Sequence, residues 1–312
     1  MPELSIVVPF YNEEENLSKL YDRLYSVLEK TEQNWEIIFV DDGSSDKTLE
    51  AAANLAENEP RVKVIALTRN FGHQAALMAG LDAARGDAIV TLDGDLQDPP
   101  ELIPEMIDKW KEGYRVVYAR RLNYRKDNFV KRWMSMLFYY MLRKLKVSSA
   151  PKNVGDFRLI DRRVMAELRK MRERTRYLRG MISWLGFDSA FVDYQRPDRE
   201  NGKAGYSFAK LIRLAMDGFF SFSRLPLRIG LFLGVISIMT GLGFMAYMVY
   251  DILANGVYYH LYKLLVDLIF IFMGFLFILI WILGEYIGRI YHEVKQRELY
   301  IIHKEINTAK EK

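Results

Sequence analysis

Residues 4–42 read LSIVVPFYNEEENLSKLYDRLYSVLEKTEQNWEIIFVDD and contain the clearest structural pattern of the chain. Two apolar, β-branched runs, Leu4–Phe10 and Glu36–Val40, flank a segment with helical periodicity, Glu14–Glu29. The two runs are continuously apolar rather than alternating, which predicts strands that are buried on both faces. A strand–helix–strand unit of this kind predicts parallel strands with a helix packed on the sheet.

The same alternation continues along the chain. Val62–Leu67 and Ala88–Leu92 are further strand candidates, and Lys47–Asn58 and Gln74–Ala84 are helix candidates. A fifth strand is predicted at Arg115–Ala119. We therefore expect an α/β domain with a mostly parallel, Rossmann-like sheet and flanking helices. Ligands of such sheets bind at the carboxyl ends of the strands.

Composition and charge narrow the class of protein. The 312 residues include no Cys, which excludes disulfides, thiolate catalysis and Cys-based zinc sites. Residues 1–112 carry 10 basic and 23 acidic side chains, residues 113–228 carry 27 and 10, and residues 229–312 carry 7 of each. This distribution predicts an acidic lobe, a basic lobe and an uncharged anchor. A basic lobe suits anionic lipid, phosphate or nucleic acid.

Two long apolar stretches predict a C-terminal two-helix transmembrane hairpin. Ile229–Tyr250 is 22 residues without a charge, and Leu268–Gly284 is another 17. As a helix the first would span roughly 33 Å, enough to cross a bilayer core. Basic side chains flank the hairpin and are scarce in its connector, which predicts cytosolic ends. The expected spans are 229–250 and 264–284, with a short external loop at 251–263.

The rest of the chain divides around this hairpin. We expect a catalytic domain at 1–206, an amphipathic juxtamembrane segment at 207–228 and a helical cytosolic tail at 285–312. No basic and apolar leader precedes the first strand, so the N-terminal domain is expected to stay in the cytosol. The basic, aromatic stretch 120–146 predicts a helix on an anionic membrane surface, with an ordinary core-packed helix as the alternative. The tail could join protomers or be solvated.

Acidic side chains gather where the predicted strands end. Asp41 and Asp42 follow the second strand, and Asp93-Gly94-Asp95-Leu96-Gln97-Asp98 follows the fourth. Asp93, Asp95 and Gln97 alternate along an extended segment and would therefore share one side. Such oxygen ligands suit Mg²⁺ or Mn²⁺ held against a substrate phosphate, whereas an unliganded surface loop is the alternative. The sequence contains neither a Gly-x-Gly-x-x-Gly loop after the first strand nor a P-loop.

Four motifs in this order resemble the inverting glycosyltransferases of family 2, which have the GT-A fold. They are Val7–Glu13, Val40–Asp46, Arg69–Gln74 and Asp93–Pro100. Within that family they are similar to the polyprenyl-phosphate glycosyltransferases, the group of dolichol-phosphate mannose synthase and bactoprenol glucosyltransferase. The hairpin and the tail motif Gly284–Tyr291 resemble the bacterial bactoprenol branch most.

The resemblance implies a donor site and an acceptor site. The residues that it places at the nucleotide sugar are Pro9, Tyr11, Glu13, Asp93, Gly94 and Asp42, the last on the base. It also implies that Asp93, Asp95 and Gln97 hold the metal against the diphosphate, so that Asp95 takes part in catalysis. Asp156, in the segment Asn153–Leu159, is implied to face the acceptor as the base.

The role of Asp156 has two alternatives at this point. Because an acceptor phosphate is already an oxyanion near neutral pH, Asp156 is expected to orient more than to abstract a proton. The other alternative is that Asp156 caps a helix predicted at Ile160–Leu168.

Basic side chains are expected to contact the phosphates. The candidates for the acceptor phosphate, with ordinary surface cations as the alternative, are Arg120, Arg121, Arg125, Lys131 and Arg132. The loop Arg199–Ser207 resembles the family's lid, and Arg199 and Lys203 are expected to close over the diphosphate. In this loop Ala204 replaces the usual hydroxyl residue. His73 follows a glycine in a turn and is expected to be either structural or close to the sugar.

These observations predict a membrane-bound enzyme that moves one sugar from a nucleotide diphosphate to polyprenyl phosphate at the cytosolic face of a bacterial inner membrane. UDP-glucose and undecaprenyl phosphate are the expected substrates, with mannose, aminoarabinose or GlcNAc donors as alternatives. A processive synthase is disfavoured because the chain has no Gln-x-x-Arg-Trp motif. Nucleic acid is disfavoured because the cations adjoin lipid-directed apolar surface. A silent nucleotide sensor is the alternative outside catalysis, and the resemblance implies a homo-oligomer.

Overall fold

The computed structural model describes residues 2–31, 33–122, 153–171, 173, 177–195, 225–256 and 261–308. The chain divides into two compact units, described separately below. The first comprises residues 1–139, 148–205 and 297–312, and the second comprises residues 140–147 and 206–296. The amphipathic helix expected within 120–146 and nearly all of the juxtamembrane segment expected at 207–228 lie outside the described residues.

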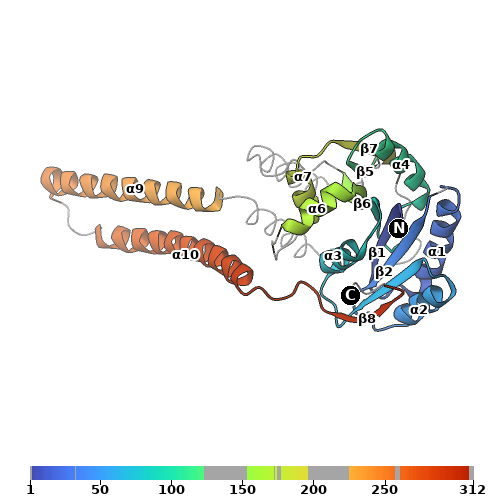
Figure 1. Ribbon diagram of the computed structural model, residues 1–312. Coiled ribbons are helices and arrows are strands. Elements are labelled where there is room, and N and C mark those ends of the chain that lie inside the picture. Colours follow the sequence, from blue (N-terminus) through green and yellow to red (C-terminus); the bar gives the residue numbers. More distant parts are fainter. Residues whose placement is uncertain are drawn as a thin grey trace. The chain divides into compact units, whose positions relative to one another are not determined.

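The first unit is built on an eight-stranded sheet with the strand order β7-β5-β6-β4-β1-β2-β3-β8 (Figure 1). Its strands are β1 (Leu4–Phe10), β2 (Trp35–Asp41), β3 (Val62–Leu67), β4 (Ala88–Thr91), β5 (Val116–Arg121), β6 (Val154–Asp161), β7 (Ser189–Tyr194) and β8 (Ile302–Ile306). β4, β1, β2 and β3 are parallel neighbours, and β5 is parallel to β7. β6 runs antiparallel between β4 and β5. The predicted α/β class with a mostly parallel sheet is confirmed.

Helices cover both faces of this sheet. They are α1 (Glu14–Leu28), α2 (Thr48–Asn58), α3 (His73–Ala83), the 3₁₀ turn η1 (Pro100–Leu102), α4 (Ile103–Lys111), α6 (Arg162–Lys170) and α7 (Leu178–Trp184). One apolar core joins α1, α2 and α4 to one face, and a second joins α3, α6 and α7 to the other. Every residue of β1 is buried, and its side chains enter the two cores alternately. The continuous apolar runs therefore reflect burial on both faces.

The C-terminal tail differs from the helix expected at 285–312. Helix α10 (Leu261–Val294) ends early, and β8 then pairs antiparallel with the edge strand β3. The Nδ2 group of Asn307 donates to the carbonyl oxygens of Ala56 and Val62 at 2.6 and 2.9 Å. The tail thus covers an edge whose backbone groups would otherwise be open to another chain.

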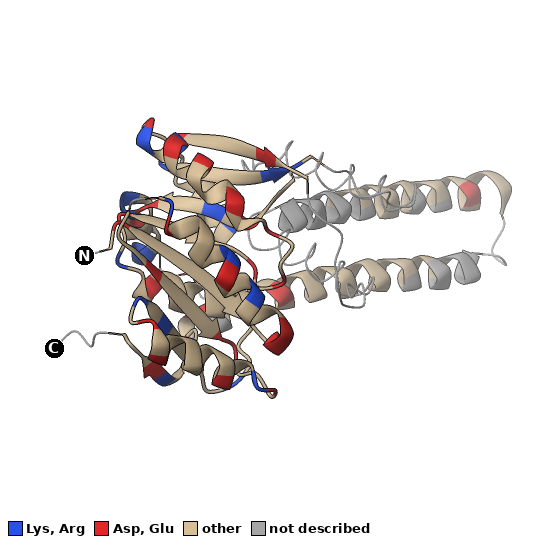
Figure 2. Cartoon of the chain, turned by 90° about the vertical axis from the view of Figure 1, so that its right-hand side faces the viewer, with Lys and Arg blue, Asp and Glu red and all other residues tan. Residues whose placement is uncertain are grey.

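The second unit contains two long helices, α9 (Leu225–Asn255) and α10. They lie side by side, and an added Cβ at Gly241 of α9 would meet the ring of Phe272 of α10 at 3.7 Å (Figure 1). Large apolar side chains on both are open to the surroundings, with Leu253 82% and Phe277 61% exposed. In Figure 2 the described parts of these helices are mostly tan, with few charged residues.

One stretch within the described parts of the chain is long and apolar enough to cross a membrane. It is Ile271–Gly288 of α10, with a mean hydropathy of 2.1. The expected spans at 229–250 and 264–284 both fall inside long helices. The two-span hairpin itself stays a prediction.

Candidate active site

The acidic residues singled out in the sequence meet at the carboxyl edge of the parallel strands. The loop Asp93–Asp98 follows β4 at this edge. β6 runs the opposite way, with Arg158 opposite Thr91, so its first residues reach the same edge. The hydroxyl of Thr91 donates to the main-chain carbonyl of Asp156, which fixes Asp156 just beyond the end of β4.

The loop after β4 is shaped by a close approach to β1. A Cβ added at Gly94 would lie 3.3 Å from both the Cβ of Phe10 and the carbonyl oxygen of Pro9, so glycine allows the loop to pack there. The main-chain N–H of Gln97 donates to Oδ1 of Asp95 at 3.1 Å, and the Gln97 side chain is buried. The turn therefore fixes Asp95 while Gln97 faces inward.

Asp93 carries a carboxylate oxygen without a hydrogen bond. Its Oδ1 is buried and accepts none from the described residues. Burial, followed by the nearby carboxylate of Asp98, raises the pKa of Asp93 to about 6. A buried carboxylate beside other carboxylates is unfavourable unless a cation is present. The oxygen donors of Asp93 and Asp95 therefore fit the Mg²⁺ or Mn²⁺ that the sequence implies.

Asp156 is surrounded by donors. The guanidinium of Arg179 makes a two-pronged contact with it, Nε to Oδ1 at 3.1 Å and Nη2 to Oδ2 at 2.9 Å, and Nη2 of Arg158 also bonds Oδ1. Nε2 of His73 lies 3.4 Å from Oδ2. Burial alone would raise the pKa of Asp156, but His73 and the two arginines outweigh it and hold that pKa well below its usual range.

His73 links the loop after β4 to Asp156. It begins α3 after Gly72, whose φ of 101° favours glycine. Its Nε2 lies 3.4 Å from Oδ1 of Asp93 as well as from Asp156. Partial burial opposes protonation of the ring, but these two carboxylates raise the pKa of His73. One ligand atom from each of His73, Asp93 and Asp156 lies within 4.8 Å of the others, and these three residues are called the acidic cluster below.

The two arginines at the end of β5 point to opposite faces of the sheet. Nε of Arg121 donates to the hydroxyl of Tyr194 at 3.0 Å, and that hydroxyl donates to the buried carboxylate of Asp98 at 2.8 Å. Arg120 instead pairs with the exposed Asp193, at 2.6 and 2.7 Å. Of these two acceptor-phosphate candidates, the structure brings Arg121 to Asp98 of the loop after β4, with 3.6 Å between Nη2 and Oδ1, whereas the contacts of Arg120 are with residues of β7.

The residues expected at the nucleotide lie at the ends of β1 and β2. Pro9 is buried, Tyr11 is 46% exposed, and the main-chain N–H of Glu13 donates to Oγ1 of Thr48 at 3.0 Å. The carboxylate of Asp42 accepts from the main-chain N–H groups of residues 71 and 72, at 2.7 and 2.9 Å. In this structure Asp42 therefore holds the turn that leads into His73.

The capping alternative for Asp156 is wrong. Asp156 lies inside β6, and the helix that follows begins later than expected, at Arg162. Its cap is Asp161, whose Oδ1 accepts from the main-chain N–H of Arg163 at 2.8 Å.

Three groups of this site escaped the sequence analysis. Arg158 sits two residues after Asp156, the spacing of one face of a strand, and that period was the signal available. Arg179 and Tyr194 come from distant segments, and nothing in their neighbours marks them. Five predicted phosphate ligands lie outside the described residues: Arg125, Lys131, Arg132, Arg199 and Lys203.

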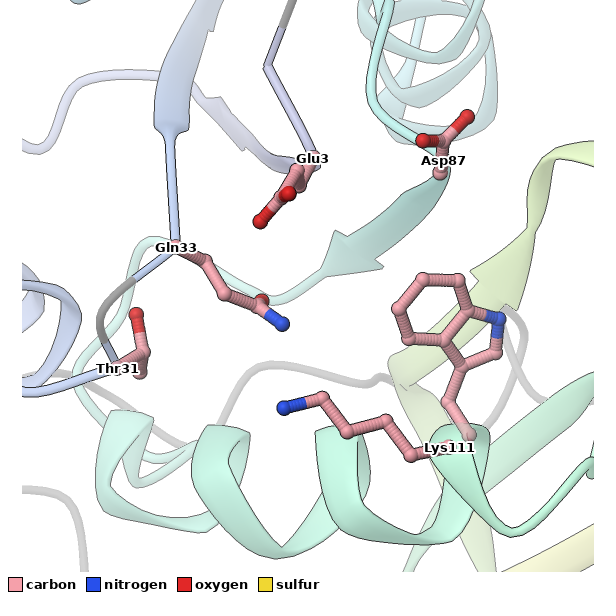
Figure 3. A pocket seen from close by; sticks show the side chains of 6 residues that line it. Glu3, Thr31, Gln33, Asp87 and Lys111 are labelled. Carbon is pink, nitrogen blue, oxygen red and sulfur yellow. The ribbon is translucent and has the colours of Figure 1, made fainter.

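A separate hollow lies at the opposite end of the strands. Figure 3 shows its lining, which is Glu3, Thr31, Gln33, Asp87, Trp110 and Lys111, around a cavity of about 420 Å³. Glu3 precedes β1 and Asp87 precedes β4, so this is the amino edge. None of the predicted site residues lines it.

Comparison with known proteins identifies the family of the chain. Residues 5–169 match the family described as "Glycosyl transferase family 2". The uncharacterized glycosyltransferase YkcC of Bacillus subtilis (strain 168) is 42% identical, over 97% of this chain and 94% of its own. The SfII prophage-derived bactoprenol glucosyl transferase of Shigella flexneri is 41% identical, over 97% and 98%. A prophage bactoprenol glucosyl transferase homolog of Escherichia coli (strain K12) is 40% identical, over 96% and 98%.

Solved structures are more distant. Glucosyl-3-phosphoglycerate synthase from Mycobacterium tuberculosis, in complex with Mn²⁺, UDP and phosphoglyceric acid, is 19% identical with a TM-score of 0.47, over 70% of this chain and 75% of that one. The family match spans more than half of the chain and contains the whole acidic cluster. This protein is a glycosyltransferase and belongs to glycosyl transferase family 2.

Proposed function

We propose that the protein transfers one glucosyl group from UDP-glucose to undecaprenyl phosphate. The observation that carries this proposal is the similarity to proteins named bactoprenol glucosyl transferase, which runs over 97% of the chain and so includes the apolar helices. A relative that shared only the sheet would say nothing of a lipid acceptor. The same relatives support glucose over the alternative sugars.

The donor is proposed to lie along the edge formed by β2, β1 and β4. Tyr11, Glu13 and Asp42 would contact the nucleoside, and Asp93 and Asp95 would hold a divalent metal with the diphosphate. The bound metal would offset the negative charge that develops on the departing diphosphate. The buried Oδ1 of Asp93, which accepts no hydrogen bond from the described residues, supports this assignment.

The reaction is proposed to be a single displacement with inversion. An oxygen of the acceptor phosphate attacks the anomeric carbon of the sugar, the bond from that carbon to the diphosphate oxygen breaks, and its electron pair leaves with UDP. Because both phosphates are anionic at neutral pH, the step needs no proton transfer. Asp156, which receives donors from three side chains, then serves to orient its neighbours.

Membrane attachment through both long helices is part of the proposal. Their exposed apolar side chains suit lipid, and Arg289, Lys295 and Arg297 near the end of α10 favour a cytosolic position for that end. The catalytic unit would then face the cytosol of a bacterial inner membrane. A homo-oligomer stays a prediction.

Radiolabel transfer tests this function. Purified full-length protein in detergent is given labelled UDP-glucose, UDP-GlcNAc or GDP-mannose with undecaprenyl phosphate, in Mg²⁺, Mn²⁺ or EDTA. We expect lipid-phase label from UDP-glucose alone, with either metal and not with EDTA. Label from another donor would overturn the sugar, and UDP binding without transfer from any donor would favour a nucleotide sensor.

A further inference from the structure

We infer that Arg179, held by Asp156, is a binding residue for the phosphate of the lipid acceptor. The inference rests on the proposed function and concerns the β6 side of the cluster. Arg179 is accessible beside Asp156, is held in a fixed position and lies on the cationic side of the sheet edge.

Around Asp156, two guanidinium groups share one carboxylate. Arg158 and Arg179 share a single carboxylate, that of Asp156. The side chain of Arg158 is 1% exposed, and its Nη2 also reaches the main-chain carbonyl of Gly155 at 3.2 Å. The side chain of Arg179 is 36% exposed. The guanidinium of Arg179 is therefore accessible, whereas that of Arg158 is enclosed beside Asp156.

Arg179 is held rigidly enough to act as a ligand. It lies in the first turn of α7, whose neighbouring side chains Leu178, Met181 and Ile182 are buried in the core. The main-chain N–H of Leu178 donates to Oε1 of Gln74 at 3.4 Å, which ties the start of α7 to the start of α3. Arg179 uses Nε and Nη2 on Asp156, and its Nη1 bonds none of the described residues. A fixed guanidinium with a spare N–H edge suits a phosphate.

The position along the edge selects the acceptor over the donor. In the strand order, β1 and β2 lie on one side of β4, and β6 and β5 lie on the other. The β1 and β2 ends carry acidic Glu13, Asp41 and Asp42. The β6 and β5 ends carry the cations, Arg179 with Asp156 and Arg121 with Tyr194. An anionic acceptor approaching the sugar on β4 is favoured from the cationic side.

In this arrangement Asp156 is a positioning residue. Its carboxylate fixes the fork of Arg179 through Nε and Nη2 and pairs with Arg158, while the side chain of Arg179 stays 36% exposed. The incoming phosphate oxygen is oriented for attack, and its negative charge is balanced until it bonds the anomeric carbon. No proton moves to Asp156.

Ligand binding separates this inference from the proposed function. Full-length protein in detergent, with UDP and Mn²⁺ present, is titrated with farnesyl phosphate and with farnesol, which lacks the phosphate. For Arg179→Gln we expect about a 10- to 100-fold loss of farnesyl phosphate affinity, the loss of one or two charge-assisted hydrogen bonds. Farnesol binding and UDP affinity should stay within about twofold of wild type.

Matched variants complete the test. Arg162→Gln removes a surface cation that pairs with Asp87 at 3.5 Å, with the two side chains 57% and 59% exposed. This variant should leave the affinities for farnesyl phosphate and UDP unchanged. Arg179→Lys keeps the positive charge but lacks the planar guanidinium, so it should lose less farnesyl phosphate affinity than Arg179→Gln. It replaces Arg179→Gln in the titration if that variant does not fold. An equal loss of UDP affinity would place Arg179 on the donor diphosphate, and unchanged farnesyl phosphate affinity would return it to a structural role; either overturns the inference. Absent sugar transfer with normal farnesyl phosphate binding by wild type would instead refute the proposed function.

Discussion

Replacing Asp156 by Asn should destabilise the catalytic unit by about 3–5 kcal/mol. The change keeps the shape of the side chain but removes the charge that balances Arg158, which is buried and otherwise bonds the main-chain carbonyls of Gly155 and Asp156. Asn also turns one acceptor oxygen into an N–H donor, which faces the N–H groups of Arg158 and Arg179. An unpaired buried charge is the reason for the size of the effect.

Thermal denaturation of the full chain in detergent measures this loss. For a unit of this size, 1 kcal/mol corresponds to about 2–4 °C, so the melting temperature should fall by about 6–20 °C. Asp193→Asn is the matched control, because it breaks another two-pronged contact with an arginine, Arg120, in an exposed place. That variant should have the same melting temperature as the wild type.

A general base open to substrate would behave differently. Its replacement by Asn would remove activity and leave the melting temperature within about 2 °C of wild type, the range of ordinary surface changes. That result would refute the account of Asp156 as the anchor of two arginines. Adding Arg158→Met to Asp156→Asn should recover part of the loss, because the unpaired buried charge is then gone.

Three further predictions concern the cap, the tail and the metal loop. Asp161→Ala should cost about 2–4 kcal/mol at neutral pH, because Asp161 accepts from Trp110, Arg115 and a main-chain N–H at 2.8 Å each. Burial would raise the pKa of Asp161, but these donors outweigh it and lower that pKa. The stabilisation by Asp161 is therefore complete above about pH 4 and is lost as the pH falls further. A difference in melting temperature between variant and wild type that grows in acid would contradict this. Asn307→Ala removes two hydrogen bonds that hold the tail and should cost about 1–2 kcal/mol, with faster amide hydrogen exchange in β8; unchanged exchange there would mean that β8 is held by its ladder alone. Asp93→Asn should weaken UDP binding about tenfold or more in Mn²⁺ and leave it unchanged in EDTA. Equal UDP affinity of this variant and wild type in Mn²⁺ would remove Asp93 from the metal site.

The centre of the sheet could be predicted because its strands are long buried apolar runs. Leu4–Phe10 and Val62–Leu67 match the strands residue for residue, and the helices between them begin within one residue of the expected positions. β6 was missed because its sequence, VGDFRLID, contains Gly and Asp, which are depleted in strands. Asp156 and Arg158 are buried there as a pair, and Asp156 also pairs with Arg179, 23 residues further along the chain.

Some residues of the candidate site could be proposed from the sequence, and others could not. Asp93 and Asp95 could be proposed because they follow a predicted strand, and Asp156 because its segment resembles a family motif. The contacts that these residues make could not be predicted, because the partners come from different elements: His73 from α3 and Arg179 from α7. Side chains that meet only after folding leave no periodic pattern in the sequence. β8 is short and exposed, so it too lacks the pattern of a buried strand.

The mass of the lipid product tests single-sugar transfer to the lipid. Purified full-length protein is incubated with UDP-glucose, undecaprenyl phosphate and Mn²⁺, and the extracted lipid is analysed by mass spectrometry. We expect undecaprenyl phosphate that carries one hexose, with one UDP released per lipid and none of either product in EDTA. Lipid that carries several sugars, or UDP released while the lipid stays unmodified, would contradict it.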